Sequence, residues 1–377
     1  MNDTGLYDTF AHASFTRSGG GWLWSIMTDA DQFPLDIPSG PEDDIREASE
    51  KLKAAIAPFT EVVAGWNERS PDARKGLIDD LREKGRILSD ALFGGRQREF
   101  ADKLKSLDQP KLAQLTNGQI EQHLIEFCVL EDEEGEYFLG ERCLCLYRLT
   151  TRDDGVLAKM FDPDGTRWAG GRNVGYTEDD RLDSSCAVHA TPTGSATEEI
   201  SVVRKLVGTD GALIVLDELS EPLSQPNIDT FHAWMLDRHN VKHFNCHLEL
   251  TSRDFMQPRV RVRSGAFVGG SEMPRKDDYL RGSFLFLNSC SGIGWSSFRK
   301  TLPYYFDSKG AACVVFTTGP IDDAFATEFA RIIYDQLDGE KASIHDAFRK
   351  ARAILLKEGH PSALLYTYIG PDNFTLM

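Results

Sequence analysis

The sequence predicts an α/β protein whose mainly parallel sheet is flanked by helices. From residue 198 onward, short apolar runs typical of strands alternate with amphipathic segments typical of helices, as in proteins built from parallel strands and helical crossovers. Two of the apolar runs, 241–247 and 283–289, end at or beside a reactive side chain. The chain has 377 residues, of which 41% are hydrophobic, so it can bury a sizeable core.

Composition and charge narrow the class of protein. No apolar run reaches the roughly 20 residues that span a bilayer, and the start of the chain lacks the basic and apolar regions of a secretory signal. The seven cysteines are an odd number and lie mostly in strand-like runs, which suits a reducing compartment. We therefore expect a cytoplasmic protein. The net charge of −17 repels phosphate backbones and argues against direct binding of nucleic acid.

Residues 1–120 are predicted to form an N-terminal support subdomain of strands and helices. Two strand-like runs, 14–17 and 22–26, flank a glycine-rich turn and predict a hairpin. A helix is expected to begin at Pro41, and Ser70 is expected to cap a second helix. Both helices have apolar residues at three- and four-residue steps, which places one face of each in a core.

The rest of the chain, 121–377, is predicted to form the catalytic subdomain. Strand signals at 124–130 and 142–148 are separated by an acidic turn at 131–135. Residues 151–197 are rich in Gly, Asp, Ser and Thr and have only short apolar pieces. This composition predicts a mobile or cleavable loop segment.

The alternating pattern that follows sets the order of the remaining elements. We expect strands at 212–216, 241–247, 283–289, 311–317 and 364–369, and helices at 199–206, 228–236, 297–307, 323–337 and 344–356. An insertion at 250–282 separates the two reactive strands. If these two are parallel neighbours, their ends meet at the carboxyl edge of the sheet, where open α/β sheets place their chemistry.

The side chains at those two strand ends are His247 and Cys290. A histidine that exchanges a proton, beside a cysteine that becomes a thiolate, is the minimal equipment for covalent acyl transfer. The alternative interpretation of Cys290 is a buried and inert thiol at a strand end, since free cysteine is among the most buried residue types.

His243 competes with His247 for the role of general base, because both lie on one strand face. It lies four residues inside the strand end, so a hydrogen-bonded structural histidine is the preferred interpretation. Cys246 faces the other way and is expected to be a core thiol. A zinc site made of His243, His247 and Cys290 is disfavoured, because three ligands without paired spacing match no common zinc motif. We expect no metal and no cofactor.

Two motifs and several shorter segments carry a resemblance to a known family. The motifs are His-Phe-Asn-Cys-His at 243–247 and Leu-Asn-Ser-Cys-Ser-Gly at 287–292. They resemble the histidine and cysteine strands of the CHAT domain, a family of caspase-like cysteine peptidases common in prokaryotes. No tetratricopeptide repeat is present, so the chain resembles a stand-alone member. Further similar segments lie at 309–323, 329–337, 84–93 and 137–140.

This resemblance implies a caspase-like fold and a cysteine endopeptidase. His247 would act as general acid and base and Cys290 as nucleophile, while backbone amides of Leu248 and Cys290 would form the oxyanion hole. Substrate-binding residues are expected at Asn288, Gly319, Asp322 and Asp323.

Three positions depart from the family pattern. Leu248 stands where the family has glycine directly after its catalytic histidine, which bears on the geometry of the oxyanion hole. Cys128 stands where an acid is expected, and Gly319 stands where a tryptophan is usual, which suggests an altered pocket. For Asp322 and Asp323, capping the following helix is the more ordinary role.

Two functions of different classes follow. The first is a cysteine endopeptidase that cleaves a partner protein through an acyl-enzyme, under the control of a protein activator, in prokaryotic defence or regulated cell death. The second is a catalytically silent caspase-like module that binds a protein partner. Arg259, Arg261 and Arg263 share a strand face within the insertion. They form either a docking edge for an activator or an ordinary solvated face.

Overall fold

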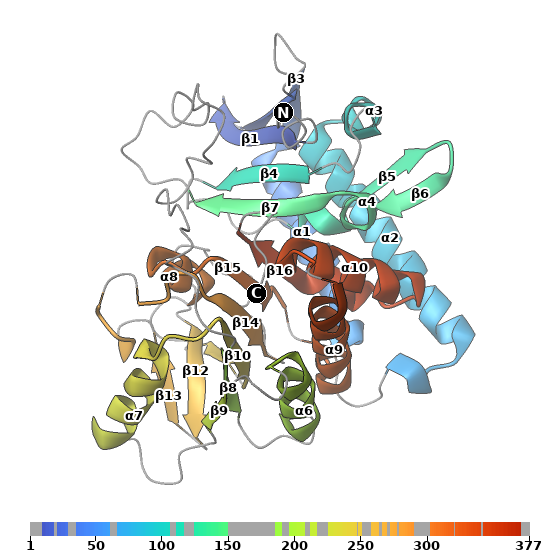
Figure 1. Ribbon diagram of the computed structural model, residues 1–377. Coiled ribbons are helices and arrows are strands. Elements are labelled where there is room, and N and C mark those ends of the chain that lie inside the picture. Colours follow the sequence, from blue (N-terminus) through green and yellow to red (C-terminus); the bar gives the residue numbers. More distant parts are fainter. Residues whose placement is uncertain are drawn as a thin grey trace, which may run out of the picture. The chain divides into compact units, whose positions relative to one another are not determined.

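The computed structural model of the protein shows how strands and helices are arranged in two parts of the chain (Figure 1). It describes residues 10–18, 21–28, 35–60, 66–105, 111–116, 124–149, 185–190, 196–207, 212–216, 225–246, 248–250, 258–263, 266–269, 272–276, 279–289, 302–319, 321–340 and 342–370.

The chain divides into two compact units. The first takes in residues 1–117, 123–148 and 359–364, and the second takes in 118–122, 149–358 and 365–377. The division into support and catalytic subdomains at residue 120 concerns function as well as packing and stays a prediction.

The sheet of the first unit contains the predicted N-terminal hairpin. Its strands follow the order β3-β2-β1-β4-β7. Strands β1 and β2 pair in antiparallel fashion with Phe15 opposite Trp24, which confirms the hairpin. The strands are β1 (Phe10–Ser18), β2 (Gly21–Thr28), β3 (Leu35–Pro41), β4 (Lys111–Thr116) and β7 (Leu144–Leu149).

The two helices predicted for the first unit begin where their sequence signals place them. Helix α1 (Glu42–Thr60) starts after Pro41, and α2 (Pro71–Phe93) is capped by the Ser70 hydroxyl, which accepts a hydrogen bond from the Ala73 amide at 3.2 Å. Gly94 ends α2 with a φ of 55°, the left-handed conformation that glycine adopts without strain. Helix α3 (Gln97–Lys105) and the short helix η1 (Trp66–Glu68) complete this set.

Aromatic side chains and one glycine hold α2 in place. Phe93 stacks on Phe100 of α3 at 4.3 Å and contacts Trp24 at 5.6 Å between ring centroids. A Cβ atom at Gly85 would collide with the carbonyl oxygen of Phe127 and lie 2.8 Å from Cγ2 of Val129. The helix therefore approaches the neighbouring backbone more closely than any larger residue would allow.

The acidic turn predicted at 131–135 is a turn, but its second strand differs from the expected one. The segment after Leu124 forms the short helix η2 (Ile125–Phe127), and the hairpin consists of β5 (Val129–Asp132) and β6 (Gly135–Phe138). Helix α4 (Leu139–Arg142) then interrupts the strand expected from Arg142, which begins only at Leu144. Four-residue strands give too short an alternation to be recognised from sequence.

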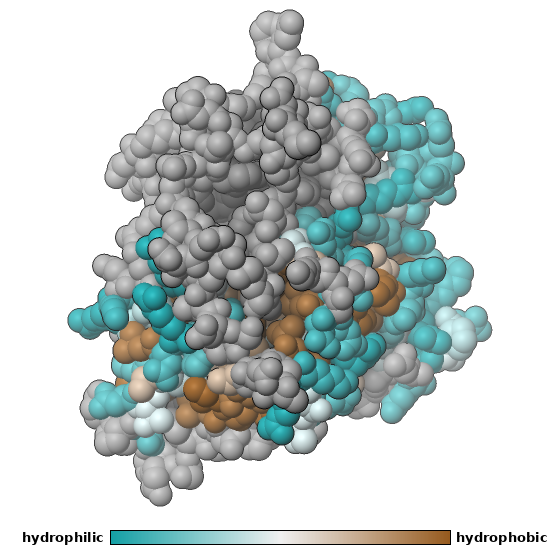
Figure 2. All heavy atoms as spheres, viewed as in Figure 1, coloured by the Kyte–Doolittle hydropathy of each residue, from teal (hydrophilic) through white to brown (hydrophobic). Residues whose placement is uncertain are grey.

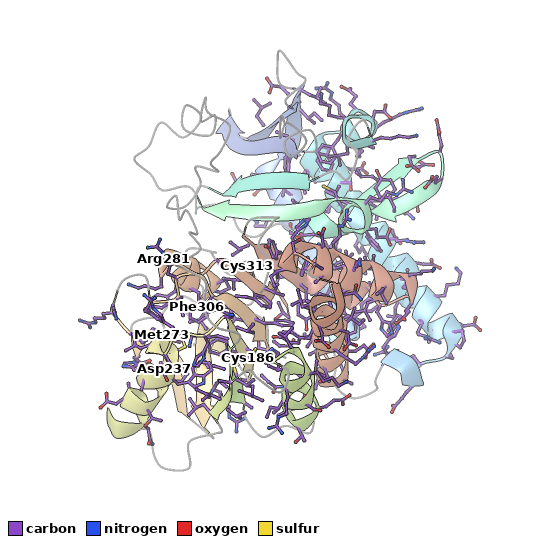
Figure 3. All side chains as sticks on the ribbon, viewed as in Figure 1. Cys186, Asp237, Met273, Arg281, Phe306 and Cys313 are labelled. Atoms are coloured by element: carbon purple, nitrogen blue, oxygen red, sulfur yellow. The ribbon has the colours of Figure 1, made fainter. Side chains whose placement is uncertain are left out.

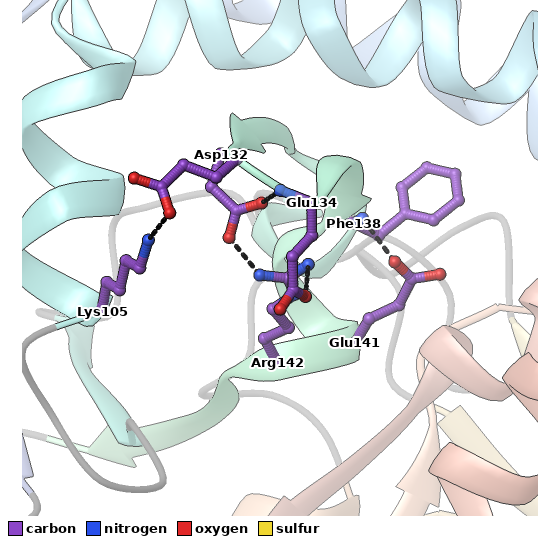
Figure 4. Close-up of polar contacts among 7 residues, drawn as sticks. Lys105, Asp132, Glu134, Phe138, Glu141 and Arg142 are labelled. Atoms are coloured by element: carbon purple, nitrogen blue, oxygen red, sulfur yellow. Dashed lines mark hydrogen bonds and ion pairs between the residues drawn. The ribbon is translucent and has the colours of Figure 1, made fainter.

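Charged groups cover this hairpin. Arg142 pairs with Asp132 and, at 3.0 Å, with Glu134, while Lys105 reaches Glu133 at 3.2 Å (Figure 4). The guanidinium of Arg142 also lies 4.0 Å from the ring centroid of Tyr137. In Figure 2 the hairpin and α3 carry hydrophilic residues, drawn in teal. Exposed ion pairs of this kind add little stability each, so the hairpin is held mainly by its buried residues Val129, Leu130, Tyr137 and Phe138.

The sheet of the second unit is mainly parallel, as predicted. Its strands follow the order β16-β15-β14-β10-β8-β9. The five strands from β9 to β15 in this order are parallel to their neighbours, and β16 runs antiparallel to β15. The strands are β8 (Ser185–Ala190), β9 (Ala212–Leu216), β10 (Val241–Asn245), β14 (Phe284–Asn288), β15 (Cys313–Thr317) and β16 (Tyr366–Ile369).

Helices cover both faces of this sheet, with α7 and α8 on one side and α6, α9 and α10 on the other (Figure 1). On the first face, Phe244 of β10 contacts Trp234 of α7 at 5.4 Å and Phe306 of α8 at 5.7 Å. On the second face, Phe286 of β14 contacts Tyr334 of α9 at 5.9 Å. These helices are α6 (Ala196–Val207), α7 (Gln225–Leu236), α8 (Leu302–Ser308), α9 (Asp323–Glu340) and α10 (Ile344–Lys357), and η6 (Pro361–Leu365) precedes β16.

Strand β8 corrects the prediction that residues 151–197 form one loop segment. It lies between β9 and β10 in the sheet, and its residues 186–190 are buried. The run Ser-Cys-Ala-Val-His-Ala was missed because it is short and contains small and polar residues that favour strands weakly. Residues 151–184 lie outside the described residues.

The insertion after β10 forms a small antiparallel sheet of its own. Strands β11 (Leu248–Leu250), β12 (Pro258–Arg263) and β13 (Ala266–Gly269) pair in that order, so the predicted strand around 259–263 is confirmed. The buried ring of His189 in β8 donates from Nε2 to the carbonyl oxygen of Arg261 at 2.8 Å. This bond ties β12 to the central sheet. None of the described helices is long and apolar enough to cross a membrane.

Candidate functional site

The two strands that precede the predicted catalytic pair are parallel neighbours. In β10 and β14, Val241 lies opposite Phe284 and the pairing continues in register to Asn245 opposite Asn288. The predicted adjacency of the two reactive runs is therefore confirmed. His247 follows Asn245 by two residues, and Cys290 follows Asn288 by two residues. Both predicted catalytic residues lie outside the described residues.

His243 takes part in a buried hydrogen-bond network on the face covered by α6 and α9. Its Nε2 lies 2.7 Å from Oε2 of Glu199 and its Nδ1 lies 2.8 Å from the hydroxyl of Tyr334. All three side chains are at most 1% exposed. The interpretation of His243 as a hydrogen-bonded structural histidine is confirmed.

The direction of these bonds follows from chemistry. A carboxylate oxygen accepts hydrogen bonds, so Nε2 of His243 donates to Glu199, and in the tautomer that this bond sets, Nδ1 accepts from the Tyr334 hydroxyl. Burial raises the pKa of Tyr334 well above its usual value, which keeps this hydroxyl protonated and able to donate. Neither Glu199 nor Tyr334 is marked in the sequence as a partner of His243.

The other oxygen of Glu199 reaches strand β14. Oε1 accepts hydrogen bonds from Nδ2 of Asn288 at 2.8 Å and from the hydroxyl of Thr327 at 3.1 Å. The amide of Asn288 also donates to the Ala326 carbonyl at 3.1 Å, and its Oδ1 accepts from the Tyr366 hydroxyl at 2.6 Å. Asn288 is 3% exposed. The side-chain amide of Asn288 therefore bonds to groups in the protein interior, and its contact with substrate stays a prediction.

The structure places the other predicted substrate-binding residues after β15. Gly319 is buried two residues beyond the strand. Asp322 caps α9, since its Oδ1 accepts hydrogen bonds from the amides of Ala324 at 3.0 Å and Phe325 at 3.1 Å. The capping role considered for Asp322 is confirmed. Asp323 is the first residue of α9, and its carbonyl oxygen lies 3.0 Å from the Thr327 hydroxyl, where it is the alternative acceptor to Glu199 for the one proton of that hydroxyl. Substrate binding by these residues stays a prediction.

The thiols whose side chains the structure describes are unsuited to nucleophilic attack. Cys186 and Cys313 lie in the sheet of the second unit (Figure 3), and burial raises the pKa of Cys186 to about 12 and that of Cys313 further. Burial also raises the pKa of Cys128. Cys246 is 4% exposed, as expected of a core thiol. A thiol nucleophile must be deprotonated, so the raised pKa values of Cys128, Cys186 and Cys313 make these three thiols poor nucleophiles.

The opposite face of β10 holds a buried lysine. Nζ of Lys242 donates to the Trp234 carbonyl at 2.8 Å and lies 4.8 Å from the centroid of that residue's ring. The side chain is 0% exposed. Burial lowers the pKa of Lys242 to about 7, and Asp237 acts in the opposite direction. Among the described residues, no three His, Cys, Asp or Glu side chains are grouped so as to hold a metal ion.

Comparisons with known proteins bear on the fold. No protein-family model matches this sequence, and no curated protein matches it. A crystal structure of the Saccharomyces cerevisiae separase–securin complex matches 96% of this chain and 30% of that chain at 10% identity, with a TM-score of 0.54. A second structure of the complex gives a TM-score of 0.51. The Arg-specific cysteine proteinase gingipain R matches 88% of this chain and 76% of its own at 9% identity, with a TM-score of 0.49.

At this level of identity the likeness to separase concerns the fold. It confirms the predicted caspase-like α/β architecture, a mostly parallel sheet flanked by helices. This chain spans 30% of the length of the separase chain that it matches. Fold likeness does not assign an activity, which depends on the residues of the site.

Proposed function

We propose that the protein is a cysteine endopeptidase of the CHAT type that acts through His247 and Cys290. The observation that supports this most is the parallel pairing of β10 with β14 in register up to Asn245 and Asn288. The two reactive residues each follow this last pair by two positions. The carboxyl edge of a parallel sheet is where such folds place their chemistry.

The reaction proceeds in two steps. His247 assists removal of the Cys290 thiol proton, and the thiolate attacks the carbonyl carbon of the scissile peptide bond. The amides of Leu248 and Cys290 stabilise the oxyanion. His247 then protonates the leaving amine, which leaves a thioester on Cys290. Water hydrolyses this acyl-enzyme, releases the carboxylate product and restores the thiol. No metal or cofactor takes part.

The substrate is a protein, and a protein partner controls the activity. The matched separase structure is a complex with securin, which supports the idea of a protein partner for this fold. Strand β12 pairs with β11 on one side and with β13 on the other, so the proposed docking surface is the face of this small sheet that carries the arginines, not a free strand edge. The side chain of Arg261 is half-buried, and those of Arg259 and Arg263 lie outside the described side chains. A setting in prokaryotic defence or regulated cell death rests on the resemblance of the motifs to the CHAT family.

Covalent labelling tests the catalytic pair. A peptide-based chloromethyl ketone is expected to label Cys290 in the wild type, to label it much more slowly in His247→Ala, and to leave Cys290→Ala unmodified. Cys246→Ala is the matched control, because Cys246 is next to His247 in the sequence but is buried. This variant is expected to be labelled at Cys290 as fast as the wild type. Equal labelling of wild type and His247→Ala would exclude the pair and favour the catalytically silent binding module.

Proteome cleavage tests the activity itself. Wild type and Cys290→Ala are incubated with a cell extract, with and without candidate partner proteins, and new protein termini are sequenced. We expect termini that appear only with the wild type and increase with the true partner. An Arg259/Arg261/Arg263→Ala variant that responds fully to that partner would remove β12 from the proposal.

A further inference from the structure

Glu199 joins the two strands that lead to the proposed catalytic pair. One carboxylate oxygen binds His243 of β10 at 2.7 Å, and the other binds Asn288 of β14 at 2.8 Å. We infer that Glu199 is a positioning residue that fixes the carboxyl ends of β10 and β14 relative to each other, and thereby His247 and Cys290. This inference rests on the proposed function.

The bridge lies where backbone pairing stops. The register of β10 and β14 ends with Asn245 opposite Asn288, so beyond this pair the described backbone ladder no longer sets the distance between the chains. Asn288 belongs to that last pair, and His243 precedes Asn245 on the same strand face. A side-chain bridge beside the last backbone pair limits how far the ends of β10 and β14 can move apart, which backbone pairing alone does not do beyond this point.

The bridge is anchored from outside the two strands. Glu199 comes from α6, and the α9 residue Thr327 donates to its Oε1 at 3.1 Å. Asn288 is held in addition by Tyr366 of β16 and by the Ala326 carbonyl of α9. Through Asn288, the end of β14 is therefore connected to the helices α6 and α9 and to strand β16.

Burial makes the bridge rigid. Glu199, His243 and Asn288 are each at most 3% exposed. A hydrogen bond to a charged group is strong where the local dielectric is low, and its loss leaves buried donors unpaired. Glu199 itself is 1% exposed, so it acts through the strands and not by contact with a substrate.

The reactivity of Cys290 is the readout. Five of the seven cysteines are described and buried, so they react slowly. In the experiment Cys145 is replaced by Ser, and Cys290 is then the remaining thiol whose alkylation is followed. The rate of alkylation by iodoacetamide is measured from pH 5 to pH 10. In this background the apparent pKa of Cys290 is expected below the ordinary value of about 8.5, because His247 stabilises the thiolate.

Glu199→Ala is expected to lower the alkylation rate at pH 7 by about tenfold to a hundredfold, as small misplacements of reacting groups do. The apparent pKa of Cys290 should move towards its ordinary value. Glu199→Gln should fold more readily and give an intermediate profile, because its amide offers one acceptor oxygen where the carboxylate offers two.

Ser283→Ala is the matched control. The Ser283 hydroxyl donates to the His239 carbonyl at 2.7 Å and is buried, so it ties the same two chain segments together just before their strands begin. Its removal is expected to lower the melting temperature, as the Glu199 variants do, and to leave the alkylation profile of Cys290 unchanged. Stability loss alone is thereby separated from positioning.

Failure of the proposed function and failure of the inference about Glu199 give different results. If wild type and His247→Ala have the same profile, the proposed function is wrong and the inference falls with it. If His247→Ala is slow but both Glu199 variants match the wild type, the inference alone is overturned. A profile of Ser283→Ala that shifts as much as those of the Glu199 variants would also overturn it, because the effect would then be general loosening.

Discussion

The Nε2 atom of His243 lies 2.7 Å from a carboxylate oxygen of Glu199, a residue 44 positions earlier in the chain. This contact brings a helix and a strand together inside the second unit. Its ring also accepts a hydrogen bond from Tyr334, so the imidazole has a partner on each nitrogen. Such a ring has a fixed orientation and a fixed tautomer.

Replacing Tyr334 by Phe is expected to destabilise the second unit by about 1–3 kcal/mol, because Nδ1 of the buried His243 loses its donor. Thermal and urea unfolding measure the change. Tyr137→Phe is a suitable comparison, since Tyr137 is also buried, at 7% exposure, and lies in the β5–β6 hairpin of the first unit. A cost for Tyr334→Phe no larger than that for Tyr137→Phe would contradict the assigned bond.

Lys242→Met is expected to stabilise the protein at low pH. The pKa of Lys242 is lowered to about 7 in the folded state, against about 10.4 when unfolded. Between these values the unfolded state binds more protons, so wild-type stability rises with pH, and below pH 7 the cost of a buried ammonium is present in full. At pH 6 this penalty amounts to about 4–5 kcal/mol; the variant gains this less the hydrogen bond to the Trp234 carbonyl that it loses, and the advantage should fade towards pH 10.

Urea unfolding at pH 6, 8 and 10 tests this prediction. Lys309→Met is the matched control, because Lys309 also donates to a backbone carbonyl and lies near an aromatic ring, but in a less buried position. An effect of Lys242→Met that does not change with pH would show that the ammonium is not strained by burial.

Gly85→Ala is expected to destabilise the first unit by about 1–3 kcal/mol, because the added Cβ has no room and the helix must shift. The obstacle is the Phe127 carbonyl oxygen together with Cγ2 of Val129 at 2.8 Å. Gly76 lies in the same helix with nothing within 4 Å of its Cβ position. Gly76→Ala should therefore stabilise by about 0.5–1 kcal/mol, and melting curves of both variants test the contrast.

Asp322 allows capping and substrate binding to be separated. Asp322→Ala should cost about 1 kcal/mol through loss of the helix cap, whereas Asp322→Asn keeps an oxygen that caps and loses the charge. If the carboxylate also binds a basic substrate residue, Asp322→Asn should unfold like the wild type and cleave such substrates more slowly. Unchanged cleavage by Asp322→Asn would leave capping as its role.

Chelators are expected to leave the proposed peptidase activity unchanged, because a free thiolate carries the reaction. Activity is measured before and after dialysis against EDTA, and zinc is measured in the purified protein. One zinc ion per chain, lost in Cys290→Ala, would overturn the dyad in favour of a metal site.

The sequence predicted the second unit better than the first for a physical reason. Strands β9, β10, β14 and β15 are apolar runs in a region where helices have a clear amphipathic pattern, and both patterns are long enough to be recognised. Strand β8 does not stand out in the sequence because it is short and most of its six residues are small or polar. The β5–β6 hairpin was misassigned because neither strand exceeds four residues.

The candidate site was predictable only in part. The strands before His247 and Cys290 were placed correctly because the chemistry stands at the ends of recognisable strands. Glu199 was missed because its neighbour Glu198 is also acidic and is exposed. Acidic residues in the first turn of a helix are common at the surface, and only the folded chain shows which one points inward.

The hydrogen bond from His189 to the Arg261 carbonyl adds to the free energy that any activator would have to supply in order to move β12. If β12 moves away from β8, the buried His189 ring loses its acceptor and the Arg261 carbonyl loses its donor. This happens beside the rings of Phe231 and Trp234, which pack against His189. Separation of β12 from β8 would be a local unfolding event with its own free energy. A partner that required this separation would have to bind the separated form more tightly by at least that amount, and its measured affinity would be weakened accordingly.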